Sequence, residues 1–217
     1  MKNIIFDFDS TLIKGESLEI LLEPILAQEP QKLIEIEKIT NMGMSGDIDF
    51  KTSLEKRLAI AKPTKKAIDN FVKSYCPNIF SKGMVELINK MHKYKYNVWI
   101  FSGGLADSIR PFAEHLNIPK ENIYAVEVEW DGKGEFIKLN SSNGAAESKT
   151  TAMDKIKDKF KNIESIVVGD GYTDYQLYEK GYVDKFVAYA EHAQRENVLA
   201  KAKYIAKDSK ELEALLF

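Results

Sequence analysis

The opening of this chain constrains its fold more than any other segment. An apolar run rich in Ile and Phe ends in two carboxylates, Asp7 and Asp9, separated by a single residue. Such a run is typical of a buried strand. Because side chains alternate along a strand, Asp7 and Asp9 are predicted to point one way, and Phe6 and Phe8 the other. Two carboxylates at ~4 Å repel by about 4 kcal/mol at a typical effective dielectric constant, so we expect a compensating charge, most simply a divalent cation.

Composition limits the class of protein and its partners. The 217 residues suit one domain with an insertion, or two small domains. The 31 basic and 33 acidic residues give a net charge of -2, which argues against a nucleic-acid partner. No apolar run reaches membrane-spanning length, and Asp7 and Asp9 interrupt the first one, so neither a membrane segment nor a signal peptide is predicted. The single cysteine, Cys76, fits a reducing compartment, and we expect a cytoplasmic protein.

Two parts of the chain differ in their hydrophobic pattern. Residues 14–77 carry apolar side chains at helical spacing, which predicts a small helical module. Beyond residue 77, strand-like runs alternate with helical segments, which predicts a parallel sheet of the α/β class. The predicted strands are 98–101, 124–130, 136–139, 165–168, 186–188 and 204–206, and the predicted helices are 84–92, 105–116 and 148–160. The residues between 130 and 136 predict a hairpin.

Small and acidic residues follow the first strand and two later ones. Ser102-Gly103-Gly104 follows 98–101, and Gly169-Asp170-Gly171 follows 165–168, with Asp174 four positions after Asp170. Ligands of open α/β sheets bind at the carboxyl ends of strands, so the three strand ends are predicted to face one site. Backbone amides at a helix N-terminus bind anions, and two carboxylates at this spacing can share a cation.

Each of these motifs also has an interpretation without this chemistry. An Asp-x-Asp pair occurs in metal-dependent glycosyltransferases and in turns that cap a helix. Ser102 by itself is better explained as a helix N-cap, and Asp174 suits a helix N-terminus in any protein. Lys149 lies near the positive end of the helix predicted over 148–160, which suggests an anionic partner, although a solvated surface lysine explains it as simply.

In combination and in this order, the motifs resemble those of the haloacid dehalogenase superfamily of phosphohydrolases, and within it the phosphoserine phosphatase family. The four matching motifs are Asp7-Phe8-Asp9-Ser10-Thr11-Leu12, Ser102-Gly103-Gly104, Lys149, and Gly169-Asp170-Gly171 with Asp174. The resemblance covers nearly the whole chain. It implies a Rossmann-like three-layer α/β sandwich with a parallel sheet, built from residues 1–13 and 78–217, and a small α-helical cap at 14–77, inserted after the first strand.

The resemblance also implies a reaction through an aspartyl-phosphate intermediate. Asp7 is then the nucleophile, and Asp9 is the general acid and base. The implied ligands of Mg²⁺ are the side chains of Asp7, Asp170 and Asp174 and the backbone carbonyl of Asp9. The phosphate is expected to be held by Ser102, Gly103 and Lys149. The cap is expected to open and close about hinges near Lys14-Gly15 and Cys76-Pro77.

The implied substrate is a small phosphorylated molecule, phosphoserine in particular, with a place in serine biosynthesis. Phe50, Leu54, Arg57 and Ala61 share one helical face, so Arg57 is either a snorkelling surface residue or a donor for a carboxylate. By resemblance, the serine moiety is bound by Glu16, Met44, Phe50, Arg57 and Thr173, although Met44 and Phe50 alone suit the core of the cap. The family most often has Ala-Asn where this chain has Tyr172-Thr173, so we expect Tyr172 to change the pocket rim.

Three other functions remain open from the sequence. The first is hydrolysis of a different small phosphomonoester by the same mechanism. The second is a phospho-accepting receiver domain, although such domains are shorter and have no helical insertion. The third is a binding protein that has lost catalysis. The sequence does not indicate an oligomeric state.

Overall fold

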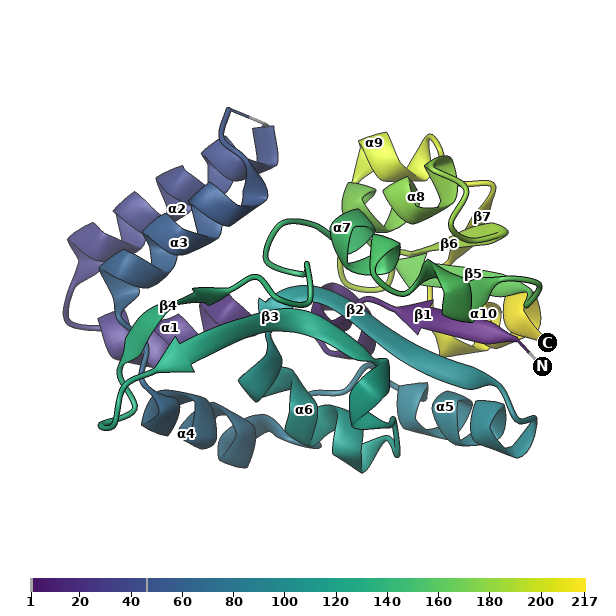
Figure 1. Ribbon diagram of the computed structural model, residues 1–217, viewed down its shortest axis with the longest axis horizontal. Helices are drawn as coiled ribbons and strands as arrows, with labels where there is room; N and C mark the ends of the chain where they lie inside the picture. Colours follow the sequence, from purple (N-terminus) through teal and green to yellow (C-terminus); the bar gives the residue numbers. More distant parts are fainter. Residues whose placement is uncertain (1, 46) are drawn as a thin grey trace.

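A central sheet organises the molecule, and its strands lie in the order β4-β3-β2-β1-β5-β6-β7 (Figure 1). The structure is a computed structural model that describes residues 2–45 and 47–217, with the backbone alone at positions 41 and 43–45. The strands are β1 (Asn3–Phe6), β2 (Asn97–Leu105), β3 (Ile123–Trp130), β4 (Phe136–Asn140), β5 (Ser165–Gly169), β6 (Lys185–Tyr189) and β7 (Tyr204–Ala206). Neighbouring strands are parallel except β3 and β4, which form the predicted antiparallel hairpin.

Helices cover both faces of this sheet, which confirms the predicted three-layer α/β fold (Figure 1). One face packs on α5 (Met84–Lys93), α6 (Ala106–His115) and α10 (Ser209–Leu216), and the other on α7 (Lys149–Asp154), α8 (Tyr172–Glu179) and α9 (Glu196–Leu199). The alternation in β1 follows these layers, because Ile4 and Phe6 join one apolar cluster and Ile5 joins the other. A strand buried on both faces explains the continuous apolar run before Asp7.

Four helices lie between β1 and α5 and form a separate lobe (Figure 1). This helical insertion consists of α1 (Ser17–Leu26), α2 (Pro30–Ser45), α3 (Phe50–Ala61) and α4 (Lys65–Tyr75). It has a small apolar cluster of its own around Leu22 and Leu26. Other side chains on its helices, such as Leu58 and Phe71, belong to the main core. The domain limits given above, 13/14 and 77/78, stay a prediction.

Backbone hydrogen bonds attach the insertion to the rest of the molecule at two places. At its base, the amide of Lys14 donates to the carbonyl of Ile79 at 2.9 Å, and the amide of Ser81 donates to the carbonyl of Leu12 at 2.9 Å. On another side, the amide of Lys65 donates to the carbonyl of Gly134, in the β3–β4 hairpin turn, at 2.8 Å. The two chain segments that enter and leave the insertion are thus paired with each other.

The elements differ from the sequence-based prediction in three places. The first strand ends at Phe6, and an irregular turn over Phe8–Leu12, extended at Asp9 and left-handed at Ser10, carries the chain away from the sheet. Ser102-Gly103-Gly104 lies inside β2, whose pairing with β3 shifts register over this stretch. The helix predicted over 148–160 is divided into α7 and a 3-10 helix at Lys157–Phe160, because the backbone leaves helical angles at Ile156.

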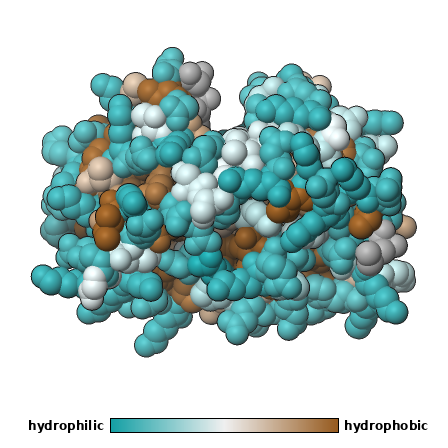
Figure 2. All heavy atoms as spheres, in the orientation of Figure 1, coloured by the Kyte–Doolittle hydropathy of each residue, from teal (hydrophilic) through white to brown (hydrophobic). Residues whose placement is uncertain are grey.

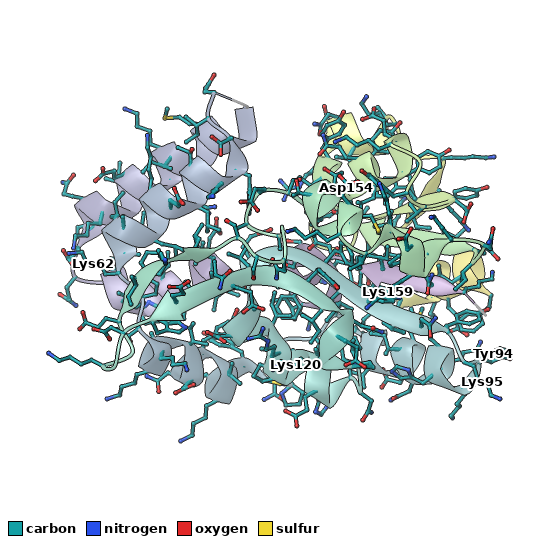
Figure 3. The ribbon with its side chains drawn as sticks, in the orientation of Figure 1. Lys62, Tyr94, Lys95, Lys120, Asp154 and Lys159 are labelled. Atoms are coloured by element: carbon teal, nitrogen blue, oxygen red, sulfur yellow. The ribbon has the colours of Figure 1, made fainter. Side chains whose placement is uncertain are left out.

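No helix in the described part of the chain is long and apolar enough to cross a membrane. The strand ends that the sequence predicts to share a site all point toward the same edge of the sheet. Tyr94 and Lys95, which precede β2, mark the opposite edge (Figure 3). The surface is hollowed between the α2–α3 end of the insertion and the α8–α9 part of the sandwich (Figure 2).

Candidate active site

A buried ion-pair cluster lies where β1, α7 and α8 meet. The ammonium of Lys149 is 2.8 Å from Asp7 Oδ2 and 2.7 Å from Asp174 Oδ1. The three side chains are 7%, 12% and 0% exposed, respectively. Lys149 reaches this position because Ser148 caps α7 and places it on the first turn. The alternative of a solvated surface lysine is therefore wrong, since both partners of Lys149 are acidic and buried.

Three carboxylates converge at the same point. Oxygens of Asp7, Asp170 and Asp174 lie within 4.8 Å of one another. Burial raises the pKa of Asp170 and of Asp174, and the negative charge of Asp7 raises both further. Hard oxygen donors in this arrangement are those that Mg²⁺ prefers, and a divalent cation would relieve their repulsion. The donor set therefore fits a divalent cation.

Gly169 makes room for this cluster. A Cβ atom at Gly169 would lie 2.2 Å from Cγ of Asp174, which no side chain tolerates. The second carboxylate of the fourth motif thus depends on glycine at the end of β5. This explains in physical terms why glycine precedes Asp170 in the motif.

Asp9 faces a different environment from Asp7. Its Oδ1 accepts a hydrogen bond of 2.7 Å from the amide of Ser17, the first residue of α1. Burial, followed by the charges of Glu16 and Asp7, raises the pKa of Asp9 to about 8, and hydrogen bonds from Ser17 oppose that shift. Lys149 contacts Asp7 and supplies positive charge beside the pair, where the sequence predicts most simply a divalent cation.

The strand segment Ser102-Gly103-Gly104 is held close to this site. Ser102 is 2% exposed, and its Oγ accepts a hydrogen bond of 2.9 Å from the amide of Gly104. A Cβ atom on Gly104 would be 3.2 Å from Asp9 Oδ2. The N-cap of α6 is Leu105, so the interpretation of Ser102 as a helix N-cap is wrong. Glycine at position 104 thus lets the backbone approach Asp9, and a phosphate-binding segment needs such close access to the backbone.

The helical insertion brings further predicted residues to the site. Glu16 Oε1 accepts a hydrogen bond of 2.9 Å from Ser10 Oγ, and burial raises the pKa of Glu16. Arg57 is half-buried; burial lowers its pKa, while the charges of Glu19 and Glu16 act in the opposite direction. Its Nε donates to the backbone carbonyl of Ser53 at 3.4 Å.

Two other predicted residues lie at the border between the insertion and the sandwich. The ring of Phe50 covers the backbone of Gly103, where a Cβ atom would meet Phe50 Cζ at 2.8 Å. Thr173 is exposed in the first turn of α8, and its Oγ1 is 3.5 Å from the Cβ position of Gly171. Met44 lies in the last turn of α2, and its side chain is outside the described part of the chain.

Tyr172 extends along α8. Its hydroxyl donates to Glu179 Oε2 at 3.0 Å, seven residues further on, and its ring stacks on Tyr175 with 5.9 Å between centroids. Lys201 lies 5.5 Å from the centroid of the Tyr172 ring. These contacts explain how α8 accommodates a large residue at this position, and they give no support to the expectation of a changed pocket rim.

Arg195 is a charged residue of the site that the sequence analysis missed. Its Nε is 2.9 Å from Asp170 Oδ2, and its Nη2 is 3.7 Å from Glu16 Oε1. It thus joins a carboxylate of the sandwich to one next to the insertion. Arg195 follows β6, another strand of the parallel sheet, so the rule on strand carboxyl ends would have indicated this loop had it been applied there.

Known proteins are similar to this chain in sequence and in fold. The family described as haloacid dehalogenase-like hydrolase matches residues 4–179. Phosphoserine phosphatase of Homo sapiens is 27% identical over 211 residues, which cover 96% of this chain and 90% of the human protein. Chloroplastic phosphoserine phosphatase of Arabidopsis thaliana is 29% identical over 204 residues, which cover 93% of this chain and 67% of the Arabidopsis protein.

Solved structures agree with the sequence matches. A phosphoserine phosphohydrolase-like protein from Francisella tularensis subsp. tularensis SCHU S4 is 58% identical, with a TM-score of 0.93 over 100% of both chains. A substrate-bound phosphoserine phosphatase has the same fold, with 21% identity and a TM-score of 0.80 over 100% of this chain and 98% of that one. This chain belongs to the haloacid dehalogenase-like hydrolase family.

Proposed function

We propose that this protein is a Mg²⁺-dependent phosphoserine phosphatase, which converts O-phospho-L-serine and water to serine and phosphate. One observation carries the proposal: the buried cluster of Asp7, Lys149 and Asp174 lies beside Asp9, the candidate general acid. The negative charge of Glu16 raises the pKa of Asp9. Arg57 supplies a cation whose pKa responds to Glu16. A phosphorylated zwitterion needs a phosphoryl-transfer cluster, an anion for its ammonium, here Glu16, and a cation for its carboxylate, here Arg57. The relatives named phosphoserine phosphatase support the same substrate.

In the first half-reaction, the Asp7 carboxylate attacks phosphorus and the bond from phosphorus to the serine oxygen breaks. The leaving oxygen takes a proton from the Asp9 carboxyl. Asp9 can hold that proton at neutral pH because burial next to Glu16 and Asp7 raises its pKa to about 8. The products of this step are serine and an aspartyl-phosphate on Asp7.

In the second half-reaction, a water molecule gives a proton to the Asp9 carboxylate while its oxygen attacks the same phosphorus. The bond between phosphorus and the Asp7 oxygen breaks, so inorganic phosphate leaves and both carboxyl groups return to their starting states. Ser102, the Gly103 amide and Lys149 are proposed to hold the phosphate oxygens during both steps.

Asp7, Asp170, Asp174 and the Asp9 backbone carbonyl are the proposed ligands of Mg²⁺. When bound, the cation supplies positive charge that offsets the repulsion between the phosphate and this carboxylate cluster. Arg195 and Lys149 carry part of that task in the protein itself, because each pairs with a proposed ligand.

Selection of serine is assigned to the helical insertion, which acts as the cap of the family. Glu16 is proposed to bind the substrate ammonium and Arg57 its carboxylate. Phe50 covers Gly103, and the cap is proposed to exclude bulk water from the phosphate side of the site when it is closed. Met44 and Thr173 complete the proposed substrate contacts. With a reducing compartment expected from the lone cysteine, we also propose a cytoplasmic location and a role in serine biosynthesis.

Steady-state kinetics on L-phosphoserine and p-nitrophenyl phosphate, each with and without Mg²⁺, tests the proposal. We expect kcat/KM to favour phosphoserine by at least about tenfold, since a site with paired polar groups rejects substrates that leave them empty. Removal of Mg²⁺ should abolish turnover of both esters. Equal turnover of a panel of phosphate esters would instead indicate a phosphatase for another small phosphomonoester.

A further inference from the structure

An ion pair crosses from the cap to the sandwich at the mouth of the proposed site. Lys51, in the first turn of α3, places its ammonium 3.2 Å from Glu147 Oε1 and 3.1 Å from Ser141 Oγ. Glu147 and Ser141 belong to the loop 141–148 between β4 and α7. This loop reaches up between α3 and α7 (Figure 1). The first turn of α3 faces it, whereas Lys62, after the last turn, lies on the far side of the cap (Figure 3).

Close packing and a hydrogen bond hold the loop that carries Glu147 in place. Gly144 has φ +83°, and a Cβ atom there would lie 2.9 Å from backbone atoms of Thr151 and Ala152. The side-chain amide of Asn143 donates to the backbone carbonyl of Ala125, in β3, at 2.8 Å. The loop thus packs closely against the start of α7, and Glu147 stands two residues before Lys149 at a fixed place.

The contact with Lys51 and Ser141 favours the ionised form of Glu147. Burial acts to raise the pKa of Glu147, but hydrogen bonds from Ser141 and Lys51 outweigh it and lower the pKa. Within the described part of the chain, Glu147 Oε2 is buried without a hydrogen-bond partner. Loss of Lys51 would therefore leave Glu147 without the ammonium that lies beside Oε1, while Oε2 stays without a partner.

The position of Lys51 links this ion pair to the phosphate side of the site. Lys51 directly follows Phe50, whose ring lies on the backbone of Gly103. The contacts of Phe50 and of Lys51 with the sandwich therefore both form when the cap lies in this one orientation. Phe50 also packs against the main apolar core, so the ion pair and the ring attach the same end of α3 to the sandwich.

The attachments of the cap differ in strength. The base and the hairpin contact consist of backbone hydrogen bonds, at 2.8 to 2.9 Å. The side chains of Lys51 and Glu147 are 37% and 35% exposed, so their attraction is weakened by water and by salt. Of these three attachments, the one at the mouth is the easiest to break, and it is the one beside the substrate.

We propose that Lys51 and Glu147 are positioning residues that clasp the cap closed at the mouth of the site, with Ser141 as an auxiliary acceptor, and so hold Phe50 over Gly103. The clasp rests on the proposed function only in that a closing cap should favour retention of a substrate. It acts on the cap rather than on the reacting atoms.

A charge swap tests the clasp. Lys51→Met and Glu147→Gln should each raise KM for L-phosphoserine by about two- to fivefold, the range that an exposed ion pair can supply, with little loss of kcat. The double variant Lys51→Glu/Glu147→Lys should restore KM, and Lys51→Arg should retain it. Lys56→Met, an exposed lysine on the same helix, is the matched control and should leave KM unchanged. Added NaCl should raise KM in the wild-type protein more than in Lys51→Met.

A second readout does not depend on the substrate. Amide hydrogen exchange of residues 50–54 in the substrate-free protein should be faster in Lys51→Met than in Lys56→Met, and slow again in the swapped variant. If phosphoserine were not a substrate, this readout would still report on the clasp. Exchange and KM values in Lys51→Met that equal those of Lys56→Met, or a swapped variant no better than the single ones, would overturn the proposal.

Discussion

The sandwich and the helical insertion contribute charges to the site in different ways. Lys149 and its partners in the sandwich are at most 12% exposed and meet at 2.7 to 2.8 Å. The cations of the insertion, Lys51 and Arg57, are partly exposed and make longer contacts, at 3.1 to 3.4 Å. Buried, mutually paired groups suit a phosphoryl-transfer step that needs fixed geometry. Partly exposed groups on a separate lobe suit the selection and release of a substrate.

The largest expected effect comes from the sandwich. Asp7→Asn keeps the size of the side chain but removes the nucleophile, so kcat should fall by at least about 10³-fold. The thermal unfolding temperature should change little, because the variant removes one of several like charges as well as one partner of Lys149. Steady-state kinetics and a thermal melt check both parts. Phosphatase activity that survives Asp7→Asn would contradict the proposed mechanism.

A smaller and more selective effect is expected from the insertion. Arg57→Ala should lower kcat/KM for L-phosphoserine by about 10²-fold, as expected for the loss of a charged hydrogen bond to a carboxylate. Turnover of p-nitrophenyl phosphate, which has no carboxylate, should change by less than about threefold. Arg57→Lys keeps the charge without the planar fork, so its kcat/KM for L-phosphoserine should lie between those of the wild-type protein and Arg57→Ala. Equal losses on both esters would assign Arg57 to cap structure instead.

The pH dependence of stability should report on the buried carboxyl of Asp9. Because burial raises the pKa of Asp9 from 3.8 to about 8, the folded protein binds more protons than the unfolded chain between these values. The metal-free protein should therefore lose stability as pH rises from 4 to about 8. Asp9→Asn removes this ionisation, so its melting temperature should fall less over that range and exceed the wild-type value by several degrees at pH 8. Glu55→Gln, an exposed residue of α3, is the control.

The smallest expected effect is stabilisation by Mg²⁺. At a cation concentration ten times Kd, the folded state should gain about 1.4 kcal/mol, which is visible as a rise of a few degrees in melting temperature. Asp170→Asn removes a carboxylate of the three-Asp cluster and should abolish most of that rise. Lys51→Met should leave it intact, since the clasp lies outside the cluster. A full response to Mg²⁺ in Asp170→Asn would remove Asp170 from the proposed ligands.

Local pattern was enough for much of the fold and of the site. The apolar run before Asp7, the helical spacing over 14–77 and the hairpin turn each depend on neighbouring residues, and the structure contains the corresponding elements. Asp7, Asp170 and Asp174 come together because strand ends in a parallel sheet share one edge. That rule needs only the positions of the strands.

Contacts between segments that are distant in sequence could not be predicted in the same way. Arg195 reaches Asp170 because β6 lies beside β5 in the sheet, and no local pattern states that order. Lys51 and Glu147 are 96 residues apart and meet only once the cap is folded onto the sandwich. The end of β2 is another such case, since its pairing with β3 extends the strand through glycines that otherwise indicate a turn.

The central place of β1 in the sheet has a consequence for synthesis of the protein. β1 is made first, yet its two neighbours are β2 and β5, and β5 ends at Gly169. At about 5–20 residues per second, a ribosome needs roughly ten to thirty seconds to add the intervening chain. Until β2 is complete at Leu105, Ile4, Ile5 and Phe6, which are fully buried in the finished protein, have no partner strand, and the second neighbour follows only with β5. The nascent chain must therefore keep this apolar segment from aggregating, and Asp7 acquires Lys149 and Asp174 only in the last third of translation.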